Sequence, residues 1–377
     1  MKDKIRVGVI GTGQIGTSHL TQYGKIPEAQ VVAVSDLFPE KVEAAKQKFG
    51  VADGYADFHE LLKRDDIDAV DVCVHNNKHA PIAIAAMQAG KHVFCEKPMA
   101  GAYRDASNMF DAARKTGRKL HIQMDTVFSP ETRAAKRLID EGRLGKIYYA
   151  RSFGYRRRGR PFVDGYGTAN FVDKAICAGG ALFDMGIYHL AQVLHLIGNP
   201  AVLTVTGATH QELEMYEDRR KFSNYSVEEM GLGWVRLAGG ISFNIEETWA
   251  VHHDGAEASK ILGGLGGLKL TPLTFFSRMG DMPASSVFDL QASDTRWHAC
   301  LPETAWHDSS QRHWVGALLG AVPLLPTAEY ALNAALISEG IYMSTKLGRE
   351  IGVDGIRQQS QSLAIDPMTP ERVWGAP

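Results

Sequence analysis

A lysine directly follows a short apolar run in the segment HVFCEKPMA, residues 92–100. A buried strand at this point would bring Lys97 to one edge of a sheet, and the ring of Pro98 would restrict the backbone beside it, in a cis or a trans peptide. An ammonium group held there can hydrogen-bond a substrate hydroxyl and stabilise the alkoxide that hydride loss requires. The competing interpretation is a solvated lysine on a surface loop.

A second set of polar residues interrupts the apolar segment GGALFDMGIYHLAQVLHLIG, which predicts a helix over residues 180–197. At about 100° per residue, His189 points a quarter-turn or more away from Asp184. A buried acid without a partner is costly, so the face that carries Asp184 must meet a polar group. The alternatives are that Asp184 caps the helix or pairs with an arginine of 156–160. The polar residues predicted to share one face are Asp184, Tyr188, Gln192 and His195.

The segment GTGQIG has the G-x-G-x-x-G spacing of a dinucleotide-binding turn, and it follows a predicted strand and opens a predicted helix. Such glycines let backbone amides approach a pyrophosphate at a helix N-terminus. Asp36 comes 20 residues after the last glycine, where an acid binds ribose hydroxyls and repels a 2′-phosphate, which favours NAD over NADP. Lys41 stands close enough to keep NADP as the less favoured alternative. The predicted cofactor contacts of the turn are Gly11, Gly13, Gln14, Ile15 and Gly16.

The first third of the chain alternates apolar strands with helices, which predicts a parallel sheet covered on both faces in a Rossmann-type domain over residues 1–124. The predicted strands are 5–10, 31–36, 68–74, 92–96 and 119–124, and the helices between them include 39–50, 79–90 and 103–117.

Strand-like stretches then follow one another with few helices between them, which predicts an α+β second domain over residues 125–377 with an open, mostly antiparallel sheet. Helices are predicted over 131–142 and 329–348. We expect the helix and tail of 329–377 to be able to pack back on the first domain. The glycine-rich segment 263–270 lacks the Lys-Ser/Thr of a phosphate loop and predicts a hairpin or bulge.

The composition argues against several classes of partner. The formal net charge is −2, with 41 basic and 43 acidic residues, so no basic footprint for nucleic acid is present. No apolar run approaches the roughly 20 residues of a membrane span. Four cysteines without a CxxC pair predict reduced thiols in a cytoplasmic protein. Because adjacent strand residues face opposite ways, the pair His252–His253 does not predict a metal site, and we expect no metal.

These segments together resemble the Gfo/Idh/MocA family of glucose-fructose oxidoreductases and inositol dehydrogenases. The resemblance rests on GTGQIG, AGKHVFCEKP, GGALFDMGIYH and ETWAVH and covers nearly the whole chain. It implies an N-terminal dinucleotide domain and a C-terminal α/β domain whose open sheet often mediates dimers or tetramers. It also implies oxidation or reduction of sugars and polyols with NAD or NADP.

The resemblance assigns roles to matched positions. Lys97, preceded by Glu96, matches the EKP lysine that contacts substrate near the nicotinamide, and Asp184 matches the helix aspartate. Many members carry a histidine acid/base four residues later, where this chain has Tyr188 followed by His189. The helical-face argument favours Tyr188, whose phenol a nearby ammonium would help to ionise, but the proton carrier stays open between the two.

Further positions are matched to cofactor and substrate, and Glu96 and Lys97 are expected to contact the cofactor as well. Asn76 and His79 match the family segment that lines the cofactor, although His79 could equally cap its helix. The expected substrate contacts are Tyr155, Arg156, Arg158 and Trp249.

The sequence therefore predicts an NAD-dependent dehydrogenase or reductase of a sugar, an anhydrosugar or an inositol-like polyol, assembled as a homodimer or homotetramer through the C-terminal sheet. One alternative is a glycoside-cleaving enzyme that oxidises its substrate transiently. The other is a non-catalytic, nucleotide-sensing regulator.

Overall fold

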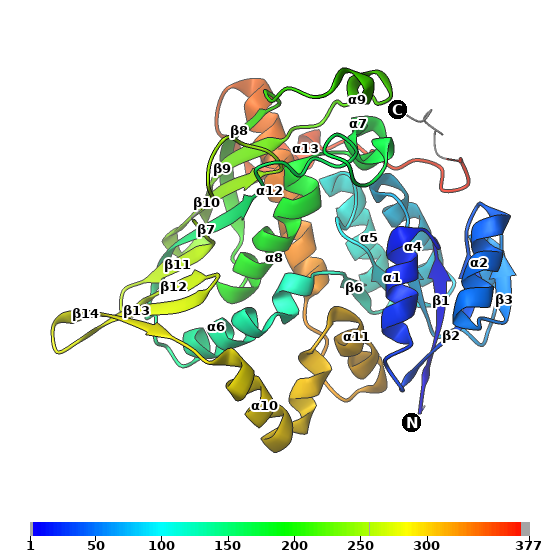
Figure 1. Ribbon diagram of the computed structural model, residues 1–377, viewed down its shortest axis with the longest axis horizontal. Helices are drawn as coiled ribbons and strands as arrows, with labels where there is room; N and C mark the ends of the chain where they lie inside the picture. The colour runs from blue at the N-terminus through cyan, green and yellow to red at the C-terminus, as the bar shows by residue number, and fades with distance from the viewer. Residues whose placement is uncertain (1–2, 256, 371–377) are drawn as a thin grey trace. The chain divides into compact units, whose positions relative to one another are not determined.

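The computed structural model describes residues 3–255 and 257–370, which divide into two compact units (Figure 1). Of the described residues, the first unit contains 3–123 together with two later segments, 303–328 and 362–370. The second unit contains residues 124–302 and 329–361. The chain therefore does not divide at a single point, because two segments from its last quarter return to the first unit.

The first unit is built on a six-stranded parallel sheet in the order β3-β2-β1-β4-β5-β6, the doubly wound order of dinucleotide-binding folds. Its strands are short and apolar, and every residue of β4 is buried, as expected for a sheet covered on both faces. The elements are β1 (Ile5–Ile10), α1 (Gln14–Tyr23), β2 (Ala29–Ser35), α2 (Pro39–Phe49), β3 (Asp53–Tyr55), α3 (Phe58–Leu62), β4 (Ala69–Val72), α4 (His79–Gln88), β5 (His92–Cys95), α5 (Tyr103–Thr116) and β6 (Leu120–Ile122).

The returning segments complete this first unit. Helix α11 (Ser310–Leu319) places Trp314 and Val315 in the same apolar core as Phe94 of β5. The backbone N–H of Ile122 donates to Thr327 Oγ1 at 3.0 Å. Helix α11 was not predicted from the sequence.

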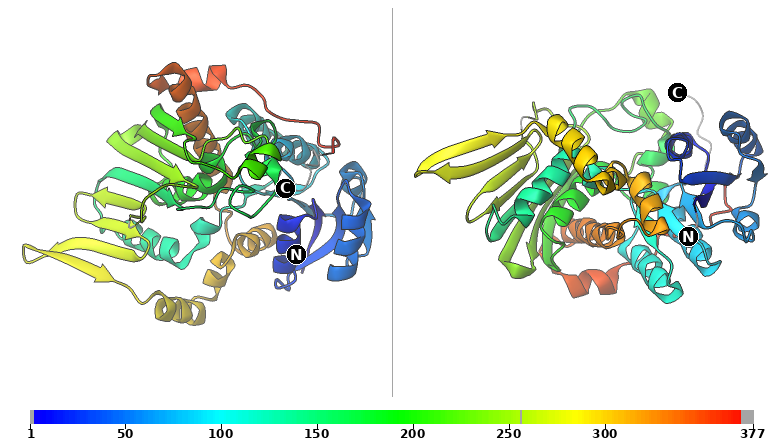
Figure 2. Two further views of the ribbon diagram at one scale, coloured as in Figure 1. Left: turned by 45° about the horizontal axis from the view of Figure 1, so that its top comes forward. Right: turned by 90° about the horizontal axis from the view of Figure 1, so that it is seen from below.

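The second unit is built on a nine-stranded sheet in the order β14-β13-β12-β11-β7-β10-β9-β8-β15. Only β7 and β10 pair in parallel, and the other neighbours are antiparallel. The β13–β14 hairpin extends beyond the rest of this sheet (Figure 2). The strands are β7 (Ile147–Tyr155), β8 (Val202–His210), β9 (Met230–Leu237), β10 (Ile241–Thr248), β11 (Lys260–Gly263), β12 (Gly267–Leu270), β13 (Leu273–Met279), β14 (Met282–Val287) and β15 (Ile351–Gly352).

Helices cover one face of the second sheet. Two glycines of β8 and β9, Gly207 and Gly233, make room for Ile341 of α12. The opposite face carries large exposed side chains, among them Trp234 (41% exposed) and Phe276 (43% exposed). The helices of this unit are α6 (Pro130–Asp140), α7 (Lys174–Cys177), α8 (Ile187–Leu196), α9 (Glu217–Lys221), α10 (Leu290–Cys300), α12 (Thr327–Leu347) and α13 (Val353–Gln359).

The predicted fold class is confirmed in both parts, a parallel Rossmann sheet and a mixed, mostly antiparallel sheet. The glycine-rich segment 263–270 forms the turn and the second strand of the β11–β12 hairpin. The helix predicted over 180–197 differs in one respect: it begins with a π-helical turn, Leu182–Gly186, before α8. Among the described residues, no helix has both the length and the apolar character needed to cross a membrane.

Candidate functional site

The glycine turn between β1 and α1 has the shape that a dinucleotide pyrophosphate requires. Gly11 adopts φ +93°, and a Cβ there would overlap the carbonyl of Cys73. A Cβ at Gly16 would overlap the carbonyl of Gly11. Around Gly13, in contrast, no atom lies within 4 Å of a built Cβ, and this residue caps α1 without a side-chain hydrogen bond. The first amides of α1 are thus approachable by an anion.

Asp36 follows β2 and turns its carboxylate towards this loop. Its Oδ2 accepts hydrogen bonds from the backbone N–H of Thr12 at 2.8 Å and from Thr12 Oγ1 at 3.2 Å. Its Oδ1 accepts from the N–H of Phe38 at 3.1 Å. These bonds fix a carboxylate beside the glycine turn, in the position where an acid binds ribose hydroxyls. Gln14 and Ile15, also predicted as cofactor contacts, are exposed at the start of α1.

Lys97 stands just beyond the carboxyl end of β5, half-buried, on a backbone that a buried acid holds in place. Glu96 Oε2 accepts the N–H of Lys97 at 3.0 Å, and Glu96 Oε1 lies 2.9 Å from His19 Nε2. The other nitrogen of His19 lies 2.8 Å from Asp71 Oδ2. Glu96, predicted as a cofactor contact, thus holds the backbone of Lys97.

The charges of this buried series reinforce one another. Burial lowers the pKa of His19, but the charge and hydrogen bond of Asp71, together with those of Cys73, outweigh burial and hold that pKa well above its ordinary value. Burial alone would raise the pKa of Glu96, but the hydrogen bond and charge of His19 lower it. The cation between two carboxylates therefore keeps the support of Lys97 ionised.

His79 joins two loops of the same region. Its Nδ1 lies 2.7 Å from the carbonyl of Pro98, which follows a cis peptide bond, and its Nε2 lies 2.9 Å from the carbonyl of Val74. The ring is fully buried, and it does not cap α4. His79 therefore connects the loop after Lys97 to the segment that contains Asn76. The side chain of Asn76 is 9% exposed.

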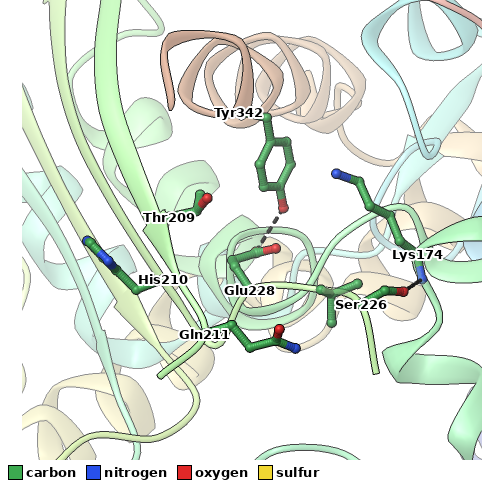
Figure 3. Close-up of a pocket in the computed structure, with 8 residues that line it drawn as sticks. Lys174, Thr209, His210, Gln211, Ser226, Glu228 and Tyr342 are labelled. Atoms are coloured by element: carbon green, nitrogen blue, oxygen red, sulfur yellow. Dashed lines mark hydrogen bonds between the residues drawn. The ribbon is translucent and has the colours of Figure 1, made fainter. Parts of the chain in front are cut away.

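In the second unit, the segment that carries Asp184 is anchored at its start by the buried carboxylate of Glu228. Glu228 accepts the N–H groups of Gly180 at 2.9 Å and Leu182 at 3.0 Å, and the hydroxyl of Tyr342 on α12 at 2.8 Å (Figure 3). Burial raises the pKa of Glu228, and these donors oppose that rise. A shallow cavity of about 180 Å³ lies beside this group, lined also by Lys174.

Asp184 itself is held by an indole. Nε1 of Trp249, a residue that is completely buried, donates to Asp184 Oδ2 at 3.0 Å. Trp249, which was predicted as a substrate contact, donates the hydrogen bond that orients Asp184. Arg156, one of the arginines expected as an alternative partner, donates from Nη1 to the hydroxyl of Tyr166 at 2.7 Å.

His189 is held by a carboxylate two residues before Trp249. Its Nδ1 lies 2.8 Å from Glu247 Oε2, and the hydroxyl of Ser152 donates to Glu247 Oε1 at 2.6 Å. Burial alone would lower the pKa of His189, but the charge and hydrogen bond of Glu247 raise it. Glu247 and Ser152 are both completely buried.

Glu247 binds His189 and Trp249 binds Asp184. These two residues are separated by one position at the end of β10, so their side chains lie on the same side of an extended chain. Asp184 and Tyr188 are predicted to share a face only if the helix is a regular α-helix. Residues Leu182–Gly186 instead form a π-helical turn. The hydroxyl of Thr126 donates to the backbone carbonyl of Tyr188 at 2.7 Å. The preference for Tyr188 over His189 on helical geometry thus loses its basis.

The residues predicted as substrate contacts separate into two groups. Arg156 and Tyr166 lie with Asp184, whose charge adds to burial in raising the pKa of Tyr166. Tyr155 stacks on Phe153, whose side chain alternates with Ser152 and so lies on the other face of β7. Its placement does not favour contact with a ligand of Asp184. The side chain of Arg158 is 58% exposed and lies 3.8 Å from Asp164.

Sequence reasoning missed Glu247, Ser152, Tyr166 and Glu228. For Glu247 a signal existed, because it alternates with Phe243, Ile245 and Trp249 in ISFNIEETWAVH. An acid on the apolar side of a strand indicates a buried carboxylate with a specific partner.

Two family models match most of the chain. The model of the oxidoreductase family with an NAD-binding Rossmann fold matches residues 5–124, and that of the GFO/IDH/MocA C-terminal domain matches residues 132–269. The chain belongs to the Gfo/Idh/MocA oxidoreductase family. A Gfo/Idh/MocA relative, D-glucoside 3-dehydrogenase of Escherichia coli K12, is 31% identical over 66% of this chain and 71% of its own length.

Other Gfo/Idh/MocA relatives align over about half of their length. The myo-inositol 2-dehydrogenase of Thermotoga maritima is 31% identical over 52% of this chain and 55% of its own, and the levoglucosan dehydrogenase of Pseudarthrobacter phenanthrenivorans is 30% identical over 52% and 51%. Among solved structures, a levoglucosan dehydrogenase in complex with NADH matches with a TM-score of 0.79 at 21% identity, covering 93% of this chain and 99% of that one. This last likeness is one of fold.

Proposed function

We propose that the protein is an NAD-dependent dehydrogenase or reductase that moves a hydride between a carbinol carbon of a sugar, anhydrosugar or polyol and nicotinamide. One observation carries the proposal. The glycine turn, Asp36 and Lys97 follow the carboxyl ends of β1, β2 and β5, so a single edge of one parallel sheet holds the dinucleotide features and a lysine whose backbone N–H is bound by Glu96. Ligands bind at that edge in doubly wound folds.

The residues of the chain divide the work as follows. The Lys97 ammonium donates to the substrate hydroxyl and stabilises the alkoxide as it forms. Asp184, oriented by Trp249, accepts a hydrogen bond from a substrate hydroxyl and fixes the sugar. Tyr188 or His189 takes the hydroxyl proton. NAD, when bound, supplies the hydride acceptor.

The proposed preference for NAD rests on Asp36. Its carboxylate is fixed by Thr12 and Phe38 rather than free to rotate away, so a 2′-phosphate would meet a negative charge at hydrogen-bonding range. The ammonium of Lys41, the residue that kept NADP as an alternative, lies over the ring of Phe38, with Nζ 4.4 Å from the ring centroid. The cation is thus engaged by an aromatic face.

The proposed substrate class rests on the relatives, which are named as dehydrogenases of a glucoside, an inositol and levoglucosan. Arg156 and Tyr166 supply further donors beside Asp184 for the hydroxyls of such a ligand. Three buried cysteines, all reduced, are consistent with the proposed cytoplasmic location.

We propose that copies associate through the uncovered face of the second sheet. Trp234 of β9 packs near Tyr149 of β7, with ring centroids 6.2 Å apart, and remains 41% exposed. Exposed aromatic area of this kind marks contact surfaces. Sedimentation velocity of the wild type and of Trp234→Glu tests this: a dimer or tetramer that dissociates in the variant is expected, and a monomeric wild type would refute it.

The function is tested by incubating purified protein with NAD or NADP and a panel of myo-inositol, methyl glucosides and levoglucosan, while nicotinamide absorbance is followed. Turnover with NAD is expected, with a loss of at least about 100-fold in Lys97→Ala and none in the exposed control Lys48→Ala. No turnover with any member, and no oxidation of NADH by keto sugars, would reject the proposal. Release of an aglycone without net NADH would point instead to glycoside cleavage.

A further inference from the structure

We propose that His189 accepts the substrate proton in this protein and that Glu247, backed by Ser152, is the residue that positions it. The inference rests on the proposed function and names the proton acceptor that the sequence left open. It places the acid/base five residues after Asp184, beyond a π-helical turn, rather than four.

The hydrogen bonds of His189 fix which ring nitrogen can act. A carboxylate only accepts hydrogen bonds, so Nδ1–H donates to Glu247 Oε2, and the neutral ring carries its lone pair on Nε2. The side chain is 25% exposed, and within the described chain Nε2 forms no hydrogen bond. This leaves an oriented proton acceptor on the side of the ring away from Glu247.

The packing around Glu247 keeps its carboxylate in this position. Gly154 is its register partner on the parallel strand β7, and a Cβ there would overlap both Glu247 Oε2 and the ring of His189. A Cβ at Gly186 would lie 2.9 Å from Glu247 Cγ. Two glycines thus make the space for the acid, and Ser152 occupies its second oxygen.

The proton balance is complete. The substrate O–H bond breaks and its proton goes to Nε2, while the electron pair left on oxygen forms the carbonyl as the C–H pair leaves as hydride to NAD. The resulting imidazolium is stabilised by Glu247. The charged groups that face His189 are Glu247 on β10 and Arg156 just after β7, whose positive charge acts in the opposite sense.

The pH profile of sugar oxidation distinguishes the two candidates. In the wild type, kcat falls on the acid side as Nε2 becomes protonated. Glu247→Gln removes the negative charge and is expected to move this limb to lower pH by about one to three units. His189→Gln is expected to lower kcat by about 10²–10⁴-fold and to abolish the limb. Tyr188→Phe changes rates without moving the limb.

Glu246→Gln is the matched control, because this neighbouring acid faces the other side of β10 and pairs with Arg151 at 2.6 Å. It is expected to leave the limb in place. A limb that stays fixed in Glu247→Gln, or that disappears in Tyr188→Phe while His189→Gln retains it, would overturn the inference.

A second readout separates this inference from the proposed function. An NMR titration of the ¹⁵N-labelled His189 ring, assigned with His189→Gln, reports its pKa without any substrate. We expect a value above 6.5 in the wild type that falls in Glu247→Gln. Absence of turnover in the wild type would reject the proposed function, whereas a ring pKa unaffected by Glu247→Gln would reject the inference whether or not turnover is seen.

Discussion

The indole N–H of Trp249 donates to the carboxylate of Asp184 at 3.0 Å from a residue with no exposed surface. This bond sets the direction of an acid that lies at the start of an otherwise apolar helix. It also explains why a tryptophan stands where the strand β10 ends: the indole combines a large apolar surface with one donor.

Trp249→Phe should therefore damage function more than folding. The variant keeps most of the buried ring but removes the donor, and a hydrogen bond to a charged group contributes about 1.5–3 kcal/mol. If that loss falls on the transition state, kcat/KM for sugar oxidation drops about 10- to 150-fold. Trp234→Phe, on the open sheet face, is the control and should leave kcat/KM unchanged. Equal effects of the two variants would contradict the role given to Trp249.

Alanine at two glycines of the same turn should have different consequences. At Gly16 a Cβ overlaps the carbonyl of Gly11, so Gly16→Ala should lower the unfolding temperature of the first unit. At Gly13 a Cβ meets nothing within 4 Å, so Gly13→Ala should fold normally and bind NAD more weakly, because the methyl group occupies the approach of the pyrophosphate. Thermal melts and fluorescence titration with NADH measure the two effects, and unimpaired NADH binding by Gly13→Ala would argue against the assigned pyrophosphate position.

Replacement of Asp36 should change the choice of coenzyme. Asp36→Ser removes the carboxylate but keeps a hydroxyl acceptor for Thr12. We expect KM for NADP to fall and KM for NAD to rise, since the 2′-phosphate no longer meets a negative charge while the ribose loses its acceptor. The ratio of kcat/KM for the two coenzymes measures this. An unchanged ratio would mean that another residue sets the preference.

The first unit should lose stability in mild acid through two buried histidines. His121 lies between Ser310 and Thr327, and its pKa is held well below the ordinary value by burial and by the neighbouring His313. Burial also lowers the pKa of His313, to about 3. Both rings are therefore neutral in the folded protein at pH values where the unfolded chain, with a histidine pKa near 6.5, takes up protons.

Because the folded protein keeps both rings neutral, the free energy of unfolding is highest above about pH 6.5. It falls as pH decreases towards 3, by up to about 1.4 kcal/mol per pH unit for each ring. Urea unfolding between pH 7.5 and 4.5 should show this slope, and His313→Asn should reduce it. A slope that is the same in wild type and variant would show that these rings do not control the acid response.

The sequence predicted the first unit well because its features are local. A glycine turn between strand and helix, and an acid at a fixed distance from it, are read from neighbouring residues. The second half of the site depends on contacts between distant segments. No local pattern reveals that Glu228 binds the start of the Asp184 helix, or that Asp184 lies in a π-helical turn that ends before His189.

The burial of Glu247 could have been predicted from the sequence. The alternation of Phe243, Ile245, Glu247 and Trp249 indicates its buried side, but its partner could not be named, because Ser152 and His189 lie 95 and 58 residues away. Tyr155 shows the reverse: a matching type at a matching position, yet on the face of β7 that lies opposite Ser152.

The two segments that return to the first unit bear on how the protein is made. Trp314 and Val315 fill the core beside Phe94, and Thr327 binds the edge strand β6. The nucleotide-binding half therefore stays incomplete on the ribosome until most of the polypeptide has emerged. Its early strands are synthesised before nearly the whole second unit. A gene fragment ending at residue 124 would therefore yield a product whose apolar core is exposed where Trp314 and Val315 pack in the full chain.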